Sequence, residues 1–192
     1  QVPDAAIAVT GNTVIDALLM EVSAQQHDPA LYATVDRSLA ALLGDDWAEV
    51  PFVLITGHRR ENFGQGFDEI CGAIAGLATR FPTYRFVYPV HLNPNVQEHV
   101  NRLLGGFSNV RLMAPQGYRH FVALMSRCRL VLTDSGGVQE EAPSLGKPVL
   151  VMRDTTERPE GVAAGTALLT GPRADAIIHH AERLLTDHAA YE

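Results

Sequence analysis

Cysteine, long apolar runs and an amino-terminal targeting pattern are scarce or lacking in this sequence. The two cysteines, Cys71 and Cys128, lie far apart in apolar segments, which predicts two buried free thiols in a reducing compartment and no disulfide. No apolar run reaches the ~20 residues that a membrane helix needs, so we expect no membrane partner. Residues 1–4 show neither the basic region nor the apolar stretch of a signal peptide, so we expect a cytoplasmic protein.

Basic charge is also in the minority. Lysine and arginine together number 15 against 22 aspartates and glutamates, which gives a formal net charge of −7. This balance argues against a nucleic-acid partner, although a small anion can still bind where donors are fixed locally. The sequence has no Cys-x-x-Cys, His-Glu-x-x-His, Gly-x-Gly-x-x-Gly or Walker-type Gly-Lys-Ser/Thr motif, which are typical of metal, dinucleotide and ATP sites. We therefore expect no metal and no cofactor.

The composition is that of a globular domain. The 192 residues are 46% hydrophobic and 19% charged, with a mean hydropathy of +0.01. No linker rich in proline, glycine or serine divides the chain, and no internal repeat occurs. We interpret residues 1–192 as a single soluble domain.

Short apolar runs typical of strands alternate with longer segments in which apolar residues recur at helical spacing. The predicted strands are residues 52–55, 85–90, 110–113, 129–133, 148–152 and 167–169, after a short β-like start at 7–9. The predicted helices cover about residues 13–25, 29–43, 67–80 and 119–126, with three more that end near 104, 145 and 185. This alternation predicts an α/β fold with a doubly wound, Rossmann-like parallel sheet of about six strands.

Polar residues follow the predicted strands. In sheets of this kind ligands bind outside the carboxyl ends of the strands, where loops and helix amino-termini gather. The loops expected there contain residues 58–62, His91, Tyr118, 134–137 and 153–160. Because the topology brings these residues to one edge of the sheet, we expect the functional site at that edge.

Residues 134–137, Asp-Ser-Gly-Gly, join a predicted buried strand to a helix. Two glycines allow a ligand to approach the backbone closely, and the first N–H groups and the dipole of a helix favour a phosphate or diphosphate. An ordinary turn with Ser135 or Asp134 as the helix N-cap explains the same residues. One of the acidic residues at 140–141 fits a ribose diol, although the helix dipole alone also favours acidic residues there.

Residues 57–62, Gly-His-Arg-Arg-Glu-Asn, follow another predicted buried strand. His58 can donate a hydrogen bond to a phosphate or move a proton near neutral pH. Arg59 and Arg60 can make bidentate contacts to phosphate oxygens. The alternative is a solvated loop in which Glu61 pairs with an arginine.

Two further groups have two interpretations each. His91, which follows the next predicted strand, fits a ligand contact or a structural histidine. The charged stretch 153–160 fits a solvated face or a wall of the site beside residues 134–137.

Five segments carry a resemblance to a known family. They are residues 10–18 (TGNTVIDAL), 56–62 (TGHRREN), 88–94 (YPVHLNP), 132–143 (LTDSGGVQEEAP) and 146–160 (GKPVLVMRDTTERPE). In their order and spacing they resemble the carboxyl-terminal half of the bacterial non-hydrolysing UDP-N-acetylglucosamine 2-epimerases. The resemblance extends from about residue 9 to the end of the sequence.

The resemblance implies one half of a glycosyltransferase-B-type two-domain fold, with a UDP-sugar in the cleft between two Rossmann-like domains. It implies an isomerase of cell-envelope polysaccharide biosynthesis that interconverts UDP-N-acetylglucosamine and UDP-N-acetylmannosamine. In that reaction UDP is eliminated to leave 2-acetamidoglucal and is added back with inversion at C2, without a cofactor or metal. The implied partners are UDP-N-acetylglucosamine or UDP, an amino-terminal domain, and a second copy in a homodimer.

The resemblance also implies roles for single residues. Ser135, Gly136 and Gly137 would hold the diphosphate, and Glu141 would hold the ribose. His58 would contact the phosphate of the leaving UDP and assist its departure, as the catalytic residue of this half.

The other implied contacts surround these. Phe121 and the loop 116–118, with Tyr118, would border the uracil, and Arg158 would lie near the sugar and phosphates. Arg59 and His91 match positions that hold a second, regulatory UDP-N-acetylglucosamine in some bacterial members.

Family members are about twice as long as this sequence, and their other half carries the carboxylates that would move the C2 proton. We therefore expect a folded nucleotide-binding half that is catalytically incomplete alone. A hydrolysing epimerase, a related glycosyltransferase domain and a non-catalytic UDP-sugar-binding module are the alternative interpretations.

Overall fold

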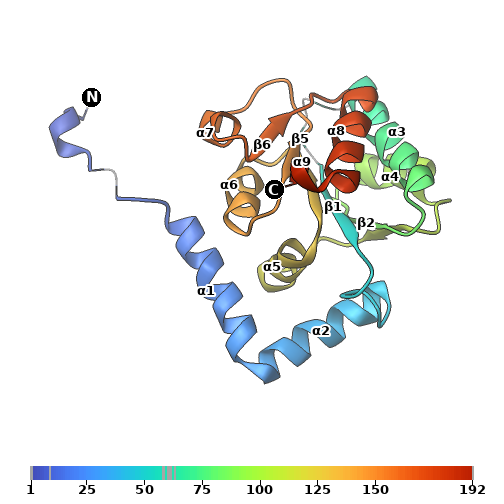
Figure 1. The fold of residues 1–192 in the computed structure, drawn as a ribbon, viewed down its shortest axis with the longest axis horizontal. Coiled ribbons are helices and arrows are strands. Elements are labelled where there is room, and N and C mark those ends of the chain that lie inside the picture. The colour runs from blue at the N-terminus through green and yellow to red at the C-terminus, as the bar shows by residue number, and fades with distance from the viewer. Residues whose placement is uncertain (1, 9, 58, 60–61, 63, 192) are drawn as a thin grey trace.

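A parallel six-stranded sheet with helices on both faces forms the body of the molecule (Figure 1). The computed structural model describes residues 2–8, 10–57, 59, 62 and 64–191. The strands lie in the order β3-β2-β1-β4-β5-β6, and every recorded pairing is parallel. Their bounds are β1 Phe52–Thr56, β2 Arg85–Pro89, β3 Val110–Met113, β4 Leu130–Thr133, β5 Val149–Val151 and β6 Ala167–Leu169. The predicted Rossmann-like α/β class is confirmed.

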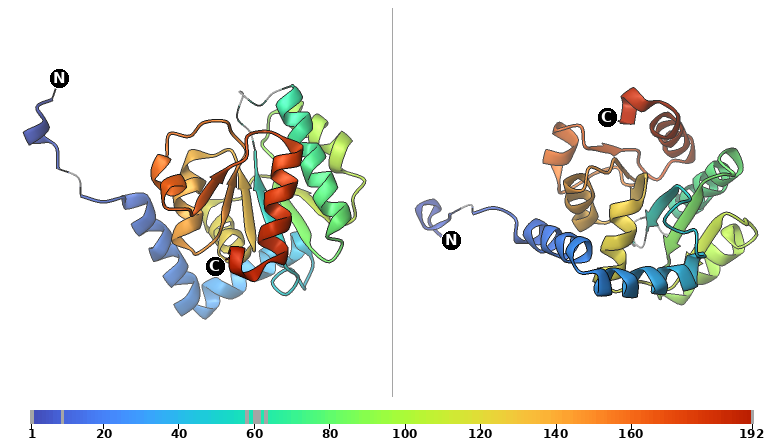
Figure 2. Two further views of the ribbon diagram at one scale, coloured as in Figure 1. Left: turned by 45° about the horizontal axis from the view of Figure 1, so that its top comes forward. Right: turned by 60° about the horizontal axis from the view of Figure 1, so that its bottom comes forward.

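Two groups of helices cover the two faces of the sheet (Figure 2). On one face lie α3 (Gln65–Arg80), α4 (Pro94–Leu104) and α8 (Ala174–Thr186), and on the other lie α1 (Thr13–His27), α2 (Pro29–Leu43), α5 (Tyr118–Arg127) and α6 (Gly136–Ser144). The shorter elements are η1 (Asp4–Ala6), α7 (Pro159–Ala163) and α9 (His188–Tyr191). Among the described residues no helix is long and apolar enough to cross a membrane.

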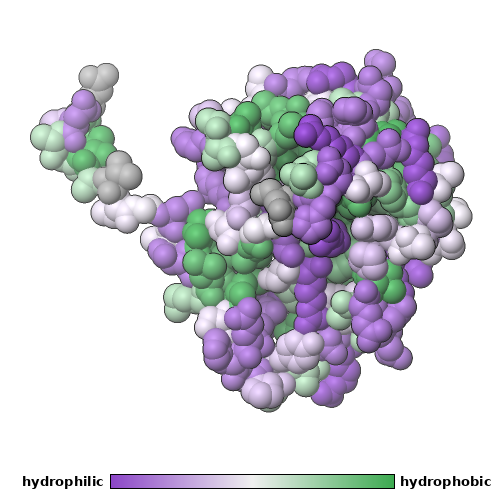
Figure 3. All heavy atoms as spheres, viewed as in Figure 1, coloured by the Kyte–Doolittle hydropathy of each residue, from purple (hydrophilic) through white to green (hydrophobic). Residues whose placement is uncertain are grey.

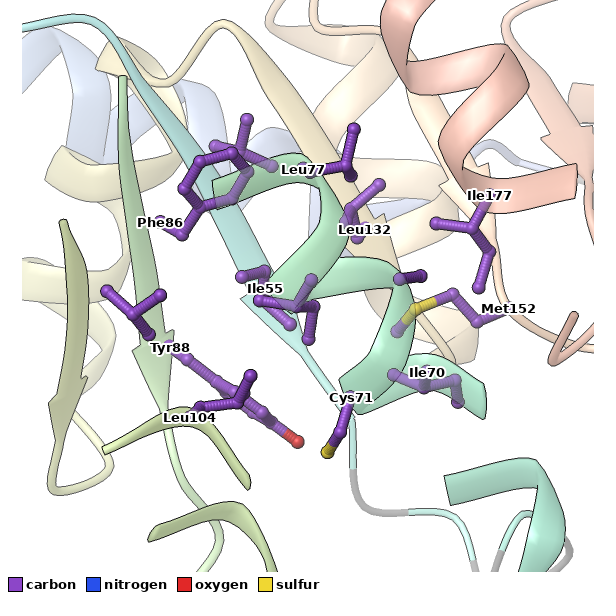
Figure 4. Close-up of a cluster of buried hydrophobic side chains, with 14 of the residues drawn as sticks. Ile55, Ile70, Cys71, Leu77, Phe86, Tyr88, Leu104, Leu132, Met152 and Ile177 are labelled. Atoms are coloured by element: carbon purple, nitrogen blue, oxygen red, sulfur yellow. The ribbon is translucent and has the colours of Figure 1, made fainter. Parts of the chain in front are cut away.

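The central strand β1 shows how the sequence builds two cores. Successive side chains of a strand point to opposite faces, so Val53 and Ile55 join the core under α3, α4 and α8, while Phe52 and Leu54 join the core under the other helices. Figure 4 shows Ile55 beside Leu132 in the first of these cores. A strand that is buried on both faces reads as an unbroken apolar run, which is why it was visible in the sequence.

The predicted free thiols are confirmed. Cys71 and Cys128 are both buried and free, one in each core. Burial raises the pKa of each thiol to about 12, so both are small apolar core residues at neutral pH.

The amino-terminal prediction was wrong where the structure tests it. Ile7 and Ala8 are not part of a strand, and they follow the short helix η1; Val9 lies outside the described residues. The segment extends away from the body of the molecule (Figure 1), and Ile7 is 60% exposed. A strand needs a neighbouring backbone to accept its hydrogen bonds, and no described strand pairs with this segment.

The strand order sets the position of the site. Strands β1 and β4 lie side by side in the middle of the sheet. From β1 the chain continues outward to β2 and β3 on one side, and from β4 it continues outward to β5 and β6 on the other. The point between β1 and β4 is therefore the topological switch point, where the loops that follow the two strands diverge to leave a crevice.

The surface in Figure 3 is mostly hydrophilic, with an apolar area where α1 borders the rest of the domain. Leu19 and Met20 of α1 are 47% and 72% exposed.

Candidate functional site

A cavity of about 210 Å³ lies at the carboxyl ends of β1 to β4. Its lining comes from four successive loops and from the starts of α5 and α6. The lining residues are Thr56, Gly57, Pro89, His91, Pro115, Gln116, Phe121, Ser135 and Val138. This is the edge at which the sequence predicts the site.

A buried carboxylate fastens two of these loops together. Asp134 is fully buried, and its Oδ2 accepts hydrogen bonds from the Arg59 backbone N–H at 2.8 Å and from the Asn62 amide at 3.3 Å. The same Asn62 amide lies 3.3 Å from the Met152 carbonyl oxygen, to which it also donates. Asp134 therefore fixes the loop after β1 against the loop after β4, and Asn62 extends the connection to the loop after β5. The N-cap residue of α6 is Ser135 and not Asp134.

Hydroxyl groups continue this network along the strand ends. The Thr56 and Thr133 hydroxyl oxygens are 2.5 Å apart, and Thr133 also accepts the Ser135 backbone N–H at 3.0 Å. The buried Tyr88 hydroxyl donates to the Gly57 carbonyl at 2.9 Å. These bonds hold the backbone around residues 57 and 135 in a fixed position.

The amino-terminus of α6 opens onto the cavity. Ser135 is the N-cap residue, but its hydroxyl makes no capping hydrogen bond to the helix. The first N–H groups of a helix have no partner within it, and the dipole there favours an anion. Ser135 lines the cavity, Gly136 is buried and Gly137 is exposed, so this turn can present a hydroxyl and backbone donors to a phosphate.

A buried acid lies one turn further along the same helix. Glu141 is 8% exposed, and its Oε2 is 4.0 Å from where a Cβ on Gly137 would lie. Burial, and then repulsion from Glu140, raises the pKa of the Glu141 carboxyl above its usual range. Burial disfavours the charged form of this carboxyl group. Hydrogen bonds donated by the hydroxyl groups of a ligand would stabilise that charged form.

The far side of the cavity is aromatic and amide-lined. Phe121 and Gln116 both line it, whereas Tyr118, the first residue of α5, is 47% exposed and is absent from the lining. His91 lines the cavity and accepts the Asn93 backbone N–H on its Nδ1 at 3.1 Å. His91 therefore supports its own loop, as a structural histidine does, and its position in the cavity lining leaves the ligand contact as a prediction.

Two groups of charges border the start of α6. Glu157 bridges two arginines, with Arg59 Nη2 at 3.3 Å and Arg153 Nη1 at 2.7 Å. The backbone N–H of Glu157 itself, then Arg153 and Arg59, hold the pKa of the Glu157 carboxyl below its usual range.

In the second group Arg158 pairs with Glu140, which also accepts a hydrogen bond from the Asn12 amide at 3.0 Å. Asn12 in turn caps α1 by accepting the Val14 backbone N–H. The amino-terminal motif at residues 10–18 is thereby connected to the edge of the site.

The structure brings most of the predicted site residues to one place. Ser135, Phe121 and His91 line the cavity. Gly136, Gly137 and Glu141 belong to α6, which begins there, and Tyr118 begins α5. Arg59 approaches the start of α6 beside Glu157, and Arg158 pairs with Glu140 of the same helix. The predicted catalytic His58 lies outside the described residues, as do Arg60 and Glu61. Within the described part of the chain no cluster of His, Cys, Asp and Glu could hold a metal ion.

The sequence interpretation missed the residues that organise the site. The sequence predicts Asp134 as a possible N-cap and assigns no separate role to Asn62 or Glu157. Their positions next to predicted strands were visible, but their partners lie 72 and 98 residues away along the chain, so no local spacing could reveal the pairs.

A second cavity, of about 310 Å³, lies at the opposite end of β5 and β6. Lys147, His180 and Arg183 contribute to its lining. It is larger, but it lies at the amino ends of the strands, away from the helix amino-termini and from the hydrogen-bond network around Asp134. Volume alone therefore does not identify the site.

Comparison with known proteins shows the family of the chain. The family model described as UDP-N-acetylglucosamine 2-epimerase matches residues 1–192. The chain belongs to the UDP-N-acetylglucosamine 2-epimerase family. The names of its relatives describe an isomerase. A probable UDP-N-acetylglucosamine 2-epimerase of Ralstonia nicotianae is 56% identical over 191 residues, and the Escherichia coli K12 UDP-N-acetylglucosamine 2-epimerase is 54% identical over 192.

A solved structure shares the fold as well as the sequence. The UDP-GlcNAc 2-epimerase of Neisseria meningitidis, bound to UDP-GlcNAc, has a TM-score of 0.92 and 46% identity, and the match covers 100% of this chain and 50% of that one. The match to each of the two curated relatives likewise covers 100% of this chain and 50% of the relative. The chain therefore spans about half the length of the relatives it matches.

Proposed function

We propose that this chain is the UDP-binding half of a non-hydrolysing UDP-N-acetylglucosamine 2-epimerase. The observation that carries the proposal is the start of α6. There a serine whose hydroxyl caps nothing lines a cavity together with Phe121, and two glycines follow it as the first residues of the helix, at the switch point of a parallel sheet. Such a helix start binds phosphates, and the family supplies the nucleotide sugar as the ligand class.

In this proposal each part of UDP has its own contacts. Ser135, Gly136 and Gly137 bind the diphosphate, and Glu141 accepts hydrogen bonds from the ribose hydroxyls. Phe121 borders the uracil together with the loop 116–118, while Tyr118 lies at the rim. Arg158 binds near the sugar and phosphates once its pairing with Glu140 rearranges.

The proposed reaction breaks the bond between C1 and the UDP oxygen and removes the C2 proton, which leaves 2-acetamidoglucal and UDP. Addition of UDP back to C1 with a proton delivered to the opposite face of C2 gives the epimer. This half of the enzyme stabilises the negative charge that develops on the departing UDP, and we propose that His58 assists that departure. The acid and base at C2 belong to the other half of a glycosyltransferase-B-type fold.

The remaining proposals concern the full-length protein. We propose a homodimer in the cytoplasm that serves cell-envelope polysaccharide biosynthesis, with Arg59 and His91 available for a regulatory UDP-N-acetylglucosamine. The exposed Leu19 and Met20 of α1 support a further protein contact. The free state of Cys71 and Cys128 supports a reducing compartment.

Isothermal titration calorimetry of this chain with UDP, and with ADP as the matched nucleotide, tests the proposal. We expect UDP to bind at least about tenfold more tightly than ADP, because the uracil cavity would have to accommodate a larger base. Equal affinity for both nucleotides, or binding of neither, would contradict the proposed half-site.

An activity assay of the full-length protein separates the enzymatic alternatives. Conversion of UDP-N-acetylglucosamine to UDP-N-acetylmannosamine is the expected result. Release of free N-acetylmannosamine would indicate the hydrolysing reaction, and transfer to an acceptor a glycosyltransferase. Binding without turnover would indicate a non-catalytic module.

A further inference from the structure

The carboxylate of Glu157 lies against the start of α6, where the proposed function places the diphosphate. Its Oε1 is only 2.8 Å from the position of a Cβ built on Gly136, and the Arg59 guanidinium is 3.7 Å from the same point. Glycine at 136 is therefore what allows a charged side chain to approach the first residue of this helix. The carboxylate belongs to the loop after β5 and reaches α6 across the crevice.

The same carboxylate holds two cations together. Its two oxygens are divided between them, with Oε1 at 3.3 Å from Arg59 Nη2 and Oε2 at 2.7 Å from Arg153 Nη1. The Arg153 side chain is 9% exposed, whereas those of Arg59 and Glu157 are 37% and 42% exposed. Arg153 thus forms a fixed, nearly buried base for the cluster, and Glu157 covers it from the solvent side.

A helix amino-terminus and two guanidinium groups are the donors that a diphosphate requires. The structure has the Glu157 carboxylate at this position, where it supplies negative charge to both guanidinium groups. We propose that Glu157 is an internal counter-ion that occupies the position of the ligand's phosphates and competes with them, so that it determines how much negative charge a ligand must carry to bind. This inference rests on the proposed UDP site, which it deepens.

The protonation state of Glu157 is consistent with this role. Its own backbone N–H and the two arginines lower the pKa of the carboxyl, so the group is ionised at neutral pH. Among the described residues the charged groups paired with it are Arg59 and Arg153. A ligand that binds the two arginines must therefore displace the Glu157 carboxylate from them. A neutral nucleoside carries no negative charge that could take its place.

The effect of removing this charge depends on the ligand. Glu157→Gln keeps an amide oxygen that can accept from Arg153 but no longer repels phosphates. We expect affinity to rise about three- to tenfold for UDP and for inorganic pyrophosphate, less for UMP, and less than about twofold for uridine, because the repulsion removed scales with ligand charge.

The experiment is calorimetric titration of wild type, Glu157→Gln and Glu160→Gln with pyrophosphate, UDP, UMP and uridine. Glu160 is exposed in α7, three residues further along, and serves as the matched control because its replacement removes the same formal charge. We expect the control to stay within about twofold of wild type for every ligand. Unchanged or weaker pyrophosphate binding by Glu157→Gln, or an equal gain for all four ligands, would overturn the proposal.

A measurement on the wild-type chain covers the case in which the variant does not fold. The ¹³C resonance of the Glu157 carboxyl should shift on addition of pyrophosphate as its arginine contacts break, and a resonance that stays in place would overturn the proposal. The same titrations distinguish a failure of the counter-ion proposal from a failure of the proposed function. If Glu157→Gln gains pyrophosphate affinity but UDP binds no better than pyrophosphate in either protein, the counter-ion role stands and the uridine site does not.

Discussion

Two helices begin at the same edge of the sheet, and their first residues are used in opposite ways. In α4 the N-cap Asn93 accepts the Asn95 backbone N–H on its own side chain at 3.0 Å, and Pro94 follows at the first helical position. In α6 the N-cap Ser135 makes no such bond, and two glycines follow. The first helix start has a side-chain cap of its own, whereas the second has none, and the proposed function assigns its donors to the diphosphate.

The difference shows how to separate structural helix starts from binding ones in a fold of this kind. A side-chain cap such as Asn93 stabilises its helix by itself. The start of α6 is held in place by its neighbours, through the buried Asp134 and the Thr133 hydroxyl. Stability and binding should therefore respond to different residues.

The largest effect is expected at Asp134. Asp134→Ala removes the acceptor of the Arg59 backbone N–H and one of the two acceptors of the buried Asn62 amide, which keeps its bond to the Met152 carbonyl. This should lower the free energy of unfolding by about 2 kcal/mol. Chemical denaturation measures this loss. The control Asp154→Asn changes an exposed carboxylate paired with Arg173 and should stay within about 0.5 kcal/mol of wild type. A loss at Asp134 no larger than the control would show that α6 is held by something else.

Asn93→Ala should reduce stability without changing UDP affinity. Loss of the cap on α4 costs about 1 kcal/mol of unfolding free energy, while the Asn93 backbone N–H that donates to His91 is retained. Denaturation and calorimetry on the same variant measure both quantities. A loss of UDP affinity equal to the loss of stability would remove the distinction between the two helix starts.

Ser135→Ala should show the reverse pattern. One hydroxyl bond to phosphate is lost, which weakens UDP binding by about 1 kcal/mol. Stability should remain within about 0.5 kcal/mol, because the hydroxyl caps nothing in the empty protein. Calorimetry with UDP and denaturation without it give the two values. Unchanged UDP affinity would exclude the Ser135 hydroxyl from the site.

The smallest effect concerns Glu141. Its pKa is raised in the folded protein, so the folded state binds its proton more tightly than the unfolded state does. This contribution to stability is present at low pH and is lost as the pH rises from the usual 4.5 through the folded value. Glu141→Gln should therefore become more stable relative to wild type as the pH rises through that window. Thermal unfolding at a series of pH values tests this, and a constant difference between the two proteins would contradict it.

Local patterns in the sequence predicted the sheet and its edge. Residues 52–55 of β1 are all apolar because both faces of the strand are buried, so a local pattern was enough to find a central strand. Ile7 was misassigned for the same reason, since an apolar residue predicts a strand only where a partner strand exists. The glycines at 136 and 137 marked a place of close approach, and in the structure the Glu157 carboxylate lies 2.8 Å from where a Cβ on Gly136 would be.

The organisation of the site could not be predicted in the same way. Asp134 is an ordinary N-cap candidate by type, and only the fold shows that its side chain instead accepts from residues 59 and 62. Glu157 lies in a charged run typical of a solvated loop, yet it reaches the start of α6. Asp134 and Glu157 each pair with polar or charged groups that are far away along the chain. No fixed spacing in the sequence marks such pairs.

The most direct test of the central claim is NMR of the ¹⁵N-labelled chain during titration with UDP. The account predicts that the largest amide shifts occur at Gly136 and Gly137, with little change at Asn95, whose N–H is already bonded within the protein. Shifts concentrated at Lys147 and Gly165, around the larger cavity, or no shifts at all, would contradict the claim that the start of α6 binds the diphosphate.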